Sequence, residues 1–502
     1  MNRPLRRLAV ACLVLLAALL ANANWVQVAQ SKRLGAEATN PRPLFQRFST
    51  DRGDIRLADG SVVARSEREP DGRTFRRLYP TGDPAEYAAV TGWAGVSSTS
   101  GLEKAEDPLL SGTDDRLSLR KFLDTFSGKQ QAGGFVVTTI NKAAQDAAWA
   151  GLRAAGKRGA LVALDTKTGA ILALASTPSF DPSPLASRDP AVVAKAYDAL
   201  LKRGDGPLLD RATQGVYPPG SFFKVVTSAA ALAAGRNPDT LVASPDRLKL
   251  PLSSSFLTNF GGESCGGAQI PLRQALTISC NTAFAQLGLD LGADKLRAQA
   301  QAFGVGEVPA GFPLPANASV FPGTLDRPQT ALSAIGQFEV KMSPLQAVMI
   351  VQAVANGGTE LAPYIVAEEH APDGSVLSKA QPRTLGTPVT GDVAAQLRDM
   401  MATVVNDPKG TAFGSRGGLA GIPAAGKTGT AQHAQGEPPH AWFGGFAPAS
   451  DPRVAVAVIV EDGGNAGSDA SGGTVAAPIA FAVLKAALCS LAPADQPAGA
   501  CR

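Results

Sequence analysis

The residues with the clearest chemical potential are a serine and a lysine three positions apart, in Ser221-Phe222-Phe223-Lys224. Tyr217-Pro218-Pro219-Gly220 precedes them and a mostly apolar run, Val225 to Leu232, follows, which predicts a loop that leads into the first turn of a buried helix. Residues at i and i+3 share a helix face, so Lys224 can point at Ser221. A lysine in apolar surroundings loses its charge readily and can take the serine proton. This pair therefore indicates nucleophilic catalysis by Ser221, with Lys224 as the base.

A serine followed by a lysine three positions later often occurs by chance. Two later motifs make this occurrence specific. Ser279-Cys280-Asn281 comes next, and Lys427-Thr428-Gly429-Thr430 follows. Three motifs of this kind, in this order and at domain-scale spacing, are typical of penicillin-binding proteins and serine β-lactamases.

The surroundings of the three motifs resemble one family in particular. The segments concerned are Pro207–Ala212, Gly215–Ser221, Gly336–Gln337, Ser343–Ala347 and Ala441–Gly445. Together they resemble the transpeptidase domain of class B penicillin-binding proteins, which cross-link peptidoglycan. The sequences of these segments are most similar to the actinobacterial PbpA branch. The clear resemblance covers Gly159 to Leu488. A fainter one, which includes Arg52-Gly53-Asp54-Ile55, extends toward the N-terminus.

The resemblance implies a role for the residues of the first two motifs. Ser221 is the nucleophile, and Lys224 is the base in acylation. Asn281 tunes the pKa of Lys224 and hydrogen-bonds the amide of the donor peptide. Ser279 relays a proton to the leaving D-alanine. The chemistry of each residue type agrees with its role.

The resemblance gives the third motif the task of binding the substrate carboxylate. Lys427 supplies positive charge, and Thr428 and Thr430 supply hydroxyl groups. Gly429 lets the strand backbone approach the substrate closely. The N–H groups of Ser221 and Thr430 form the oxyanion hole.

By the same resemblance, the donor is a peptidoglycan stem peptide that ends in D-Ala-D-Ala, and the acceptor is an amine on a neighbouring stem. β-Lactams mimic the donor and trap Ser221, no cofactor is needed, and a glycosyltransferase is a candidate partner. A D,D-carboxypeptidase or a penicillin-binding sensor or scaffold is the alternative. A β-lactamase needs a carboxylate to activate water, and no Glu-x-x-x-Asn motif occurs between Ser279 and Lys427. The region before the domain is too short for the glycosyltransferase of a class A protein.

A second Lys-Thr-Gly, at Lys167 to Gly169, lies between the apolar runs Ala160–Leu164 and Ala170–Leu174. Asp165 and Gly169 are turn residues, so this copy predicts a hairpin loop. The later copy at Lys427 is followed by Thr430-Ala431-Gln432, as in the family, and is expected to be the functional one.

Composition excludes several other classes of protein. The chain has 502 residues, 45% of them hydrophobic and 18% charged, with a net charge of +4, so nothing points to nucleic acid. The three histidines, His370, His433 and His440, lack ligand spacing and predict no metal site. His433 and His440 flank a Gly/Pro-rich segment that is expected to be an exposed loop.

The N-terminus predicts attachment to a membrane. Arg3, Arg6 and Arg7 precede an apolar stretch from Leu8 to Val28, which can span a bilayer with residues 1–7 in the cytoplasm and the catalytic domain outside. A cleaved signal peptide is the alternative, because Ala21-Asn22-Ala23 fits a small-x-small cleavage site. The family keeps a single N-terminal anchor, so the resemblance favours the anchor. Both alternatives export the enzyme.

Export makes a disulfide possible near the active site. Apart from Cys12 in the anchor, the chain has four cysteines, which allow three pairings: Cys265, Cys280, Cys489 and Cys501. The pairing Cys265–Cys280 with Cys489–Cys501 closes the two shortest loops and is the expected one. The alternative is that all four are free.

The predicted fold class is α+β, with an anchor at 8–28 and an elongated non-catalytic pedestal domain at 30–157. The transpeptidase domain is expected at 158–491, with an antiparallel sheet and a helical subdomain, followed by a tail at 492–502. Strand-like runs at both ends of the second domain, such as Val454–Val460, enclose helix-like stretches such as Asn281–Leu291. The region Ala331–Ala355 is also expected to be helical, and Lys142–Ala154 is a helix-like stretch of the pedestal.

The two Lys-Thr-Gly copies can be separated by mutation. Lys427→Ala is expected to cripple acylation by penicillin, because the substrate carboxylate loses its counter-charge. Lys167→Ala, the matched control, is expected to change the acylation rate little, because a hairpin lysine is solvated. The opposite order of the two acylation rates would show that the functional motif is misassigned.

Overall fold

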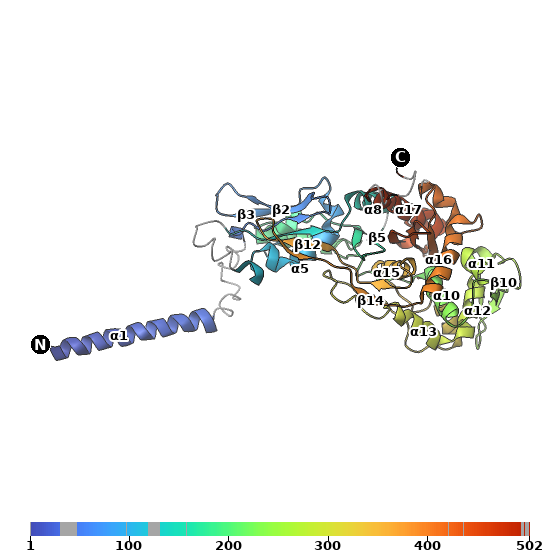
Figure 1. Ribbon diagram of the computed structural model, residues 1–502, viewed down its shortest axis with the longest axis horizontal. Coiled ribbons are helices and arrows are strands. Elements are labelled where there is room, and N and C mark those ends of the chain that lie inside the picture. The colour runs from blue at the N-terminus through green and yellow to red at the C-terminus, as the bar shows by residue number, and fades with distance from the viewer. Residues whose placement is uncertain are drawn as a thin grey trace.

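The structure is a computed structural model that describes residues 2–30, 48–96, 98–118, 131–156, 158–419, 421–434, 436–492, 496 and 501. Most of the predicted tail at 492–502 lies outside these residues. Helix α1 (Asn2–Asn24) extends away from the rest of the described chain (Figure 1). A first domain with its own sheet lies nearer to α1, and a larger second domain lies at the far end.

The second domain is built on a five-stranded antiparallel sheet. Its strands, in spatial order, are β15 (Ala425–Ala431), β16 (His440–Ala447), β17 (Val454–Val460), β5 (Gly159–Asp165) and β6 (Ile171–Thr177). Every residue of β16 and β17 is buried, so the centre of this sheet is covered on both faces, and β17 is continuously apolar rather than alternating.

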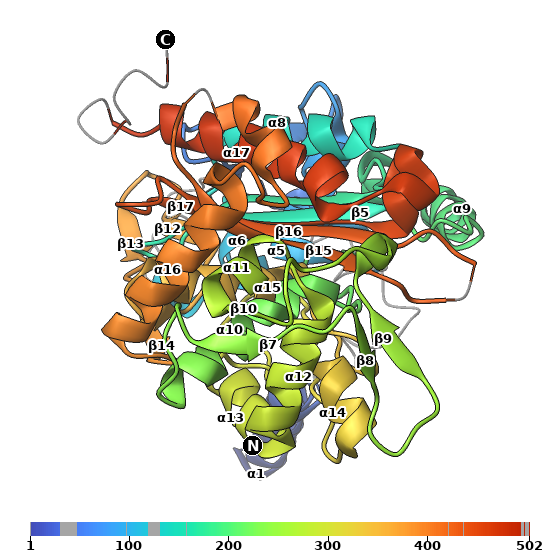
Figure 2. The same cartoon turned by 90° about the vertical axis from the view of Figure 1, so that its right-hand side faces the viewer.

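Helices cover the two faces of this sheet, as Figure 2 shows. Helices α8 (Lys142–Ala154) and α17 (Ala477–Cys489) pack together on one face, and α15 (Pro344–Ala355) packs on the other. Helix α8 was assigned to the pedestal from the sequence, but it lies against β6 and α17. The buried residues Ala144, Ala148 and Leu152, on one face of α8, explain this position.

A helical subdomain lies on the α15 side of the sheet (Figure 2). Its helices are α10 (Lys224–Ala233), α11 (Leu272–Thr277), α12 (Asn281–Leu291), α13 (Ala293–Ala302), α14 (Arg327–Ser333) and α16 (Gly391–Asn406). Short strands β7 (Leu241–Ala243), β8 (Arg247–Lys249), β9 (Phe256–Thr258) and β10 (Gln269–Pro271) border it. The predicted helical region Ala331–Ala355 is not one helix, because the chain turns between α14 and α15.

The first domain contains a six-stranded sheet that combines two distant parts of the chain. Its order is β13 (Val376–Lys379), β12 (Val366–His370), β4 (Phe135–Thr138), β1 (Ile55–Arg56), β2 (Val62–Arg68) and β3 (Phe75–Leu78). Strands β12 and β13 come from within the predicted interval 158–491. The chain therefore returns to the first domain, and a single boundary at 157 does not separate the two sheets.

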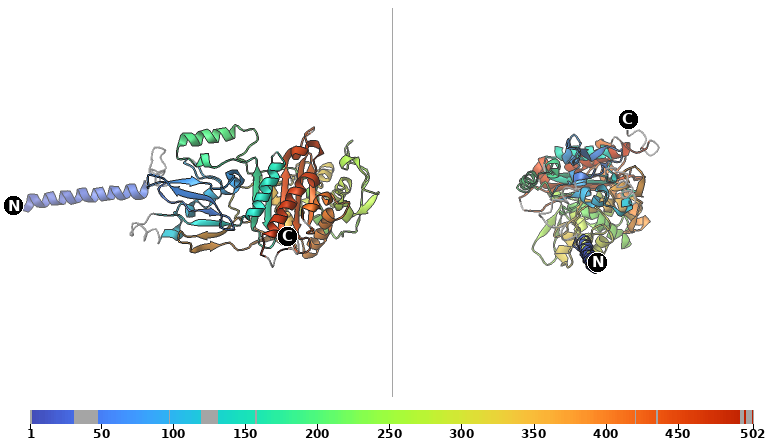
Figure 3. Two further views of the ribbon diagram at one scale, coloured as in Figure 1. Left: turned by 90° about the horizontal axis from the view of Figure 1, so that it is seen from above. Right: turned by 90° about the vertical axis from the view of Figure 1, so that its left-hand side faces the viewer.

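Shorter elements complete the two domains. Helices α4 (Ala88–Thr91), α5 (Gly101–Ala105) and α6 (Asp107–Leu110) belong to the first domain. Helix α9 (Pro190–Leu201) stands at the side of the molecule (Figure 3), and β11 (Glu360–Leu361) pairs with β14 (Thr384–Gly386).

The Arg52-Gly53 pair has a structural role in the first domain. Arg52 Nε lies 2.6 Å from Glu103, and Arg77 Nε lies 2.5 Å from the same buried carboxylate. A Cβ on Gly53 would lie 1.6 Å from the carbonyl oxygen of Gly134. Loss of one member of this cluster leaves a buried charge without its partner, which is strongly destabilising. The pair therefore organises the start of the domain.

Within the described residues, two helical segments are long and apolar enough to cross a membrane. Arg3–Ala29, which comprises α1 and the following turn Trp25–Ala29, is fully exposed in the structure, whereas Gly472–Cys489 is largely buried because α17 packs on the sheet. Only the first segment therefore offers a free apolar surface to a bilayer.

The predicted hairpin at Lys167 is confirmed. Asp165 Oδ1 accepts the backbone N–H groups of Lys167 at 2.8 Å and Thr168 at 2.9 Å, and β5 pairs with β6 across this turn. The Lys167 side chain faces outward and lies 3.6 Å from Asp451. This Lys-Thr-Gly is a surface turn.

Candidate active site

Ser221 lies in a short 3-10 turn, Gly220–Phe223, that continues into α10 at Lys224, as the sequence predicts. Two contacts fix the loop before it. Tyr217 exchanges two backbone hydrogen bonds with Met342, of 3.0 and 2.8 Å, and the indole Nε1 of Trp442 donates to the carbonyl of Pro218 at 3.0 Å. The serine is thus held between the helical subdomain and the sheet.

The three predicted motifs converge around the hydroxyl of Ser279. Lys224 Nζ donates to Ser279 Oγ at 3.2 Å, to the carbonyl oxygen of Ser279 at 2.7 Å and to Asn281 Oδ1 at 2.7 Å. Lys427 Nζ approaches from β15 and donates to Ser279 Oγ at 2.9 Å and to the carbonyl of Thr428 at 2.9 Å. One hydroxyl therefore lies between two amines.

Burial changes the acid–base properties of both lysines, whose side chains are fully excluded from solvent. Burial, and secondly the nearby charge of Lys427, holds the pKa of Lys224 well below its usual range. Burial lowers the pKa of Lys427 to about 7. A neutral amine, able to accept a proton, is therefore available at moderate pH.

The sequence predicts that Lys224 contacts Ser221 directly, but the structure shows other hydrogen-bond partners for Lys224. The hydrogen bonds of Lys224 Nζ within the described chain go to Ser279 and Asn281, and none joins it to Ser221 Oγ. Oxygen acceptors satisfy the buried amine in this way. Hydrogen bonds between catalytic groups often shorten only when substrate binds, so the geometry remains compatible with proton transfer.

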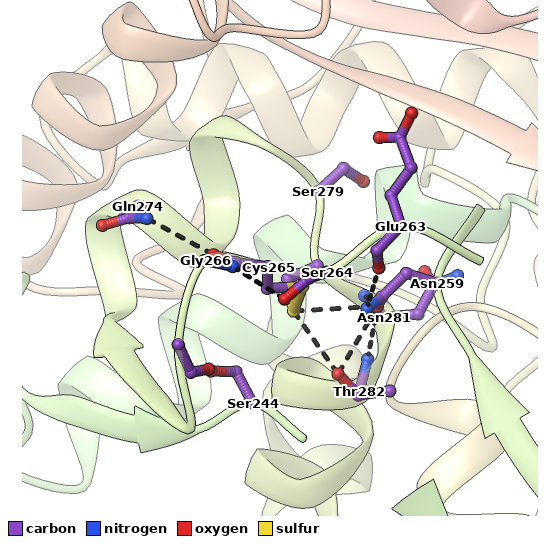
Figure 4. Close-up of a disulfide and its surroundings, with 12 residues drawn as sticks. Ser244, Asn259, Glu263, Ser264, Cys265, Gly266, Gln274, Ser279, Asn281 and Thr282 are labelled. Atoms are coloured by element: carbon purple, nitrogen blue, oxygen red, sulfur yellow. Dashed lines mark hydrogen bonds between the residues drawn. A yellow bond between two sulfur atoms is a disulfide. The ribbon is translucent and has the colours of Figure 1, made fainter. Parts of the chain in front are cut away.

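A disulfide and a helix cap fix the backbone next to Ser279. Cys280 is bonded to Cys265, which confirms the predicted pairing, and Cys489 is bonded to Cys501. Asn259 Oδ1 accepts the N–H groups of Asn281 at 2.9 Å and Thr282 at 3.1 Å, at the start of α12 (Figure 4).

Asn259 was missed by sequence reasoning, although one signal was present. Helix α12 begins after a cysteine, which is a poor N-cap, so its first N–H groups need an acceptor from elsewhere. The cap matters because Ser279 has a φ of +59°, a backbone conformation that costs free energy for a non-glycine residue.

Strand β15 passes so close to the serine loop that only glycine fits at position 429. A Cβ there would lie 2.6 Å from the carbonyl oxygen of Pro219 and 2.9 Å from Trp442 Cβ. Thr428 Oγ1 lies 2.6 Å from the hydroxyl of Thr411, a residue that the sequence analysis did not single out. The strand thus presents its hydroxyl groups beside Ser221.

A second group of missed residues fixes the loop that leads to Ser221. Glu461 Oε1 accepts from Arg211 Nε at 2.8 Å and from the hydroxyl of Tyr217 at 2.9 Å, and its other oxygen lies 3.0 Å from Arg158 Nε. Arg211 and Glu461 are buried, so this cluster joins the end of β17 to the serine loop in a region that water does not screen.

Two of the histidines, which lack ligand spacing in the sequence, come together in the fold. Folding places His433 and His440 beside Asp462, with ligand atoms of all three within 4.8 Å of one another. The two rings stack at 4.0 Å with an angle of 7° between their planes, and His440 Nδ1 accepts the backbone N–H of Asp462 at 3.1 Å. Parallel rings do not aim their in-plane lone pairs at one point, so this arrangement suits a hydrogen-bonded cluster better than a metal site.

Ser221 opens onto a cleft of about 530 Å³. Residues of all three motifs line it, together with two charged residues that the sequence analysis did not single out, Glu263 and Lys409. A second hollow, of about 560 Å³, shares Ser221, Asn281 and Thr430 with the cleft. Ser221 therefore lies where two hollows meet.

The fold and this site place the chain in a known class. The sequence model of the penicillin binding protein transpeptidase domain matches residues 159–485, and that of the penicillin binding protein A dimerisation domain matches residues 52–136. The chain belongs to the penicillin-binding protein transpeptidase family, which confirms the resemblance seen in the sequence.

Individual relatives cover nearly the whole chain. The peptidoglycan D,D-transpeptidase PbpA of Mycolicibacterium smegmatis is 44% identical over 97% of this chain and 99% of its own length, and that of Mycobacterium tuberculosis is 42% identical over the same shares. Penicillin-binding protein A from M. tuberculosis, solved as a ceftriaxone acyl-enzyme complex, superposes with a TM-score of 0.84 at 41% identity and covers 88% of this chain and 100% of that chain.

The disulfide behind Ser279 gives a test of site positioning. Loss of a closed loop of this size costs about 3 kcal/mol of stability in the chain-entropy model. We expect Cys265→Ser to slow penicillin acylation more than this loss explains, because the Ser279–Asn281 turn moves and small misplacements of catalytic groups cost large factors in rate. Stopped-flow acylation rates at a temperature where the variant is fully folded measure the effect.

Cys489→Ser is the matched control, because it breaks the other disulfide in the C-terminal part of the chain. Equal acylation rates in the two folded variants would contradict the link between the Cys265–Cys280 bond and the site. Peptide mapping without reductant shows which cysteines are joined.

Proposed function

We infer that this protein is a serine-type peptidoglycan D,D-transpeptidase that is acylated by stem peptides ending in D-Ala-D-Ala and inhibited by β-lactams. The observation that supports this best is the convergence of Lys224 and Lys427 on Ser279 beside Ser221. Relatives of nearly the same length are named peptidoglycan D,D-transpeptidases, and the structure of one relative was solved as a β-lactam acyl-enzyme complex.

In the proposed acylation step, Ser221 Oγ attacks the carbonyl carbon of the penultimate D-alanine. The proton of the hydroxyl passes to the amine of Lys224, and the oxyanion is stabilised by the N–H groups of Ser221 and Thr430. The bond to the terminal D-alanine breaks, and Ser279 relays a proton to the leaving amine. Its hydrogen bond from Lys224 supports this relay.

The terminal carboxylate of the donor is bound by the residues of β15. Lys427 contributes charge, while the hydroxyl groups of Thr428 and Thr430 contribute hydrogen bonds. Gly429 keeps the strand next to the serine loop. Asn281 holds the donor amide and orients Lys224, whose Nζ donates to it at 2.7 Å.

Amine transfer distinguishes a transpeptidase from the alternative, a D,D-carboxypeptidase. Both form the same acyl-enzyme, and they differ in whether an amine or water takes the acyl group. The full-length relatives favour the amine. A stable acyl-enzyme without either product would instead indicate a sensor.

We further propose that α1 anchors the protein in the cell membrane, with the N-terminus in the cytoplasm and the catalytic domain outside. The exposed apolar surface of Arg3–Ala29 and the three arginines at its start support this orientation. In this arrangement the first domain is a non-catalytic spacer, and with the anchor it offers a surface to a glycosyltransferase partner.

The proposed nucleophile is tested by intact-mass spectrometry after exposure to penicillin. We expect one adduct on the wild-type protein and none on Ser221→Ala, with the two proteins equally folded by circular dichroism. Ser254→Ala, in the exposed loop between β8 and β9, is the matched control and should keep the adduct. A single adduct that persists on Ser221→Ala would disprove the assignment.

A further inference from the structure

The two hollows that meet at Ser221 differ in whether charged side chains line them. The first, here called the polar arm, is lined by Glu263, Lys409, Thr411 and Thr428. The second, here called the aromatic arm, is lined by Phe256, Phe338, Leu332 and Gln432, and no charged side chain of the described residues lines it. Substrate groups that bind on the two sides of Ser221 therefore contact different side chains.

The proposed function assigns one arm to the leaving group. The terminal carboxylate of the donor binds near Thr428 and Thr430. Thr430 lines both arms and Thr428 lines the polar arm, so the departing D-alanine occupies the polar arm. Transfer of the acyl group to an amine is the chemical reverse of its release from one. By microscopic reversibility, the acceptor amine approaches the acyl carbon from the place that the leaving amine vacates. The polar arm is therefore the arm that the acceptor enters.

Glu263 is the one carboxylate that lines the polar arm among the described residues. Its side chain takes part in none of the hydrogen bonds or ion pairs that the structure defines, whereas its backbone is fixed. Asn259 Nδ2 donates to the carbonyl of Glu263 at 2.9 Å, and the disulfide holds Cys265 two residues later. Figure 4 shows its carboxylate pointing away from the disulfide, to the same side as Ser279.

We propose that Glu263 binds the ammonium group of the acceptor and stabilises the positive charge that its nitrogen carries during attack. In this step the nitrogen forms a bond to the acyl carbon and the bond to Ser221 Oγ breaks. The acceptor enters as an ammonium ion and loses one proton to solvent, which frees the nitrogen lone pair for attack. The nitrogen becomes positive again as its bond to the acyl carbon forms, and its second proton passes to Ser221 Oγ, so the amide product and the free serine are both neutral. This inference rests on the proposed transpeptidase function.

The test uses an N-acyl-D-alanyl thioester as donor and D-alanine or D-alaninamide as acceptor, with aminolysis and hydrolysis products quantified by mass spectrometry. The ratio of aminolysis to hydrolysis rises with acceptor concentration, and its slope measures acceptor binding and attack. We expect Glu263→Gln to lower this slope about three- to fivefold for both acceptors, because a single exposed ion pair is lost. Added salt should lower the wild-type slope more than that of the variant.

Glu437→Gln is the matched control and should leave the slope unchanged, because this carboxylate lines a neighbouring hollow beside His433 and does not line the polar arm. The penicillin acylation rate of each variant measures the donor half-reaction separately. A slope in Glu263→Gln equal to that of the wild type, or a parallel loss of aminolysis and hydrolysis, would overturn the role in acceptor binding. Absence of aminolysis product in the wild-type protein would instead contradict the proposed function.

Discussion

The structure of the active site depends on the burial of two lysines around one serine hydroxyl. Lys224 and Lys427 are both excluded from water, and each donates to Ser279 Oγ. An unpaired buried amine is costly, so the fold must supply oxygen acceptors from the Ser279–Asn281 turn and from β15. The same burial depresses the pKa of both amines. Burial of the lysines therefore costs free energy, but it also leaves a neutral amine that can act as a base.

Several contacts outside the motifs keep this arrangement in place. The disulfide and Asn259 fix the turn that contains Ser279, which would otherwise relax from its left-handed backbone conformation. Glu461 fixes the serine loop through Arg211 and Tyr217. Each of these residues positions a motif residue through another contact. The proposed catalytic groups therefore come from three short motifs, while their geometry depends on the whole domain.

The sequence predicts the local elements well where hydrophobic pattern and turn residues agree. Helix α12 and strand β17 have the predicted bounds, because both have a clear apolar pattern and pack along most of their length. Contacts between distant segments could not be read in this way. Strands β12 and β13 return to the first sheet, Asn259 caps a helix more than twenty residues later, and His433 meets Asp462. Each of these contacts depends on the topology of the fold, which local patterns do not specify.

The pH dependence of acylation tests the central role of the buried amine most directly. The measurement is the second-order rate constant for penicillin acylation of the wild-type protein across the pH range in which it stays folded. A proton on Lys224 abolishes its action as a base, so we predict that the rate constant falls as pH decreases through the depressed pKa of Lys224. It should also fall as pH rises above the pKa of Lys427, about 7, because the charge that binds the carboxylate is then lost. A rate constant that still rises as pH approaches about 10, the usual pKa of a solvated lysine, would contradict the account.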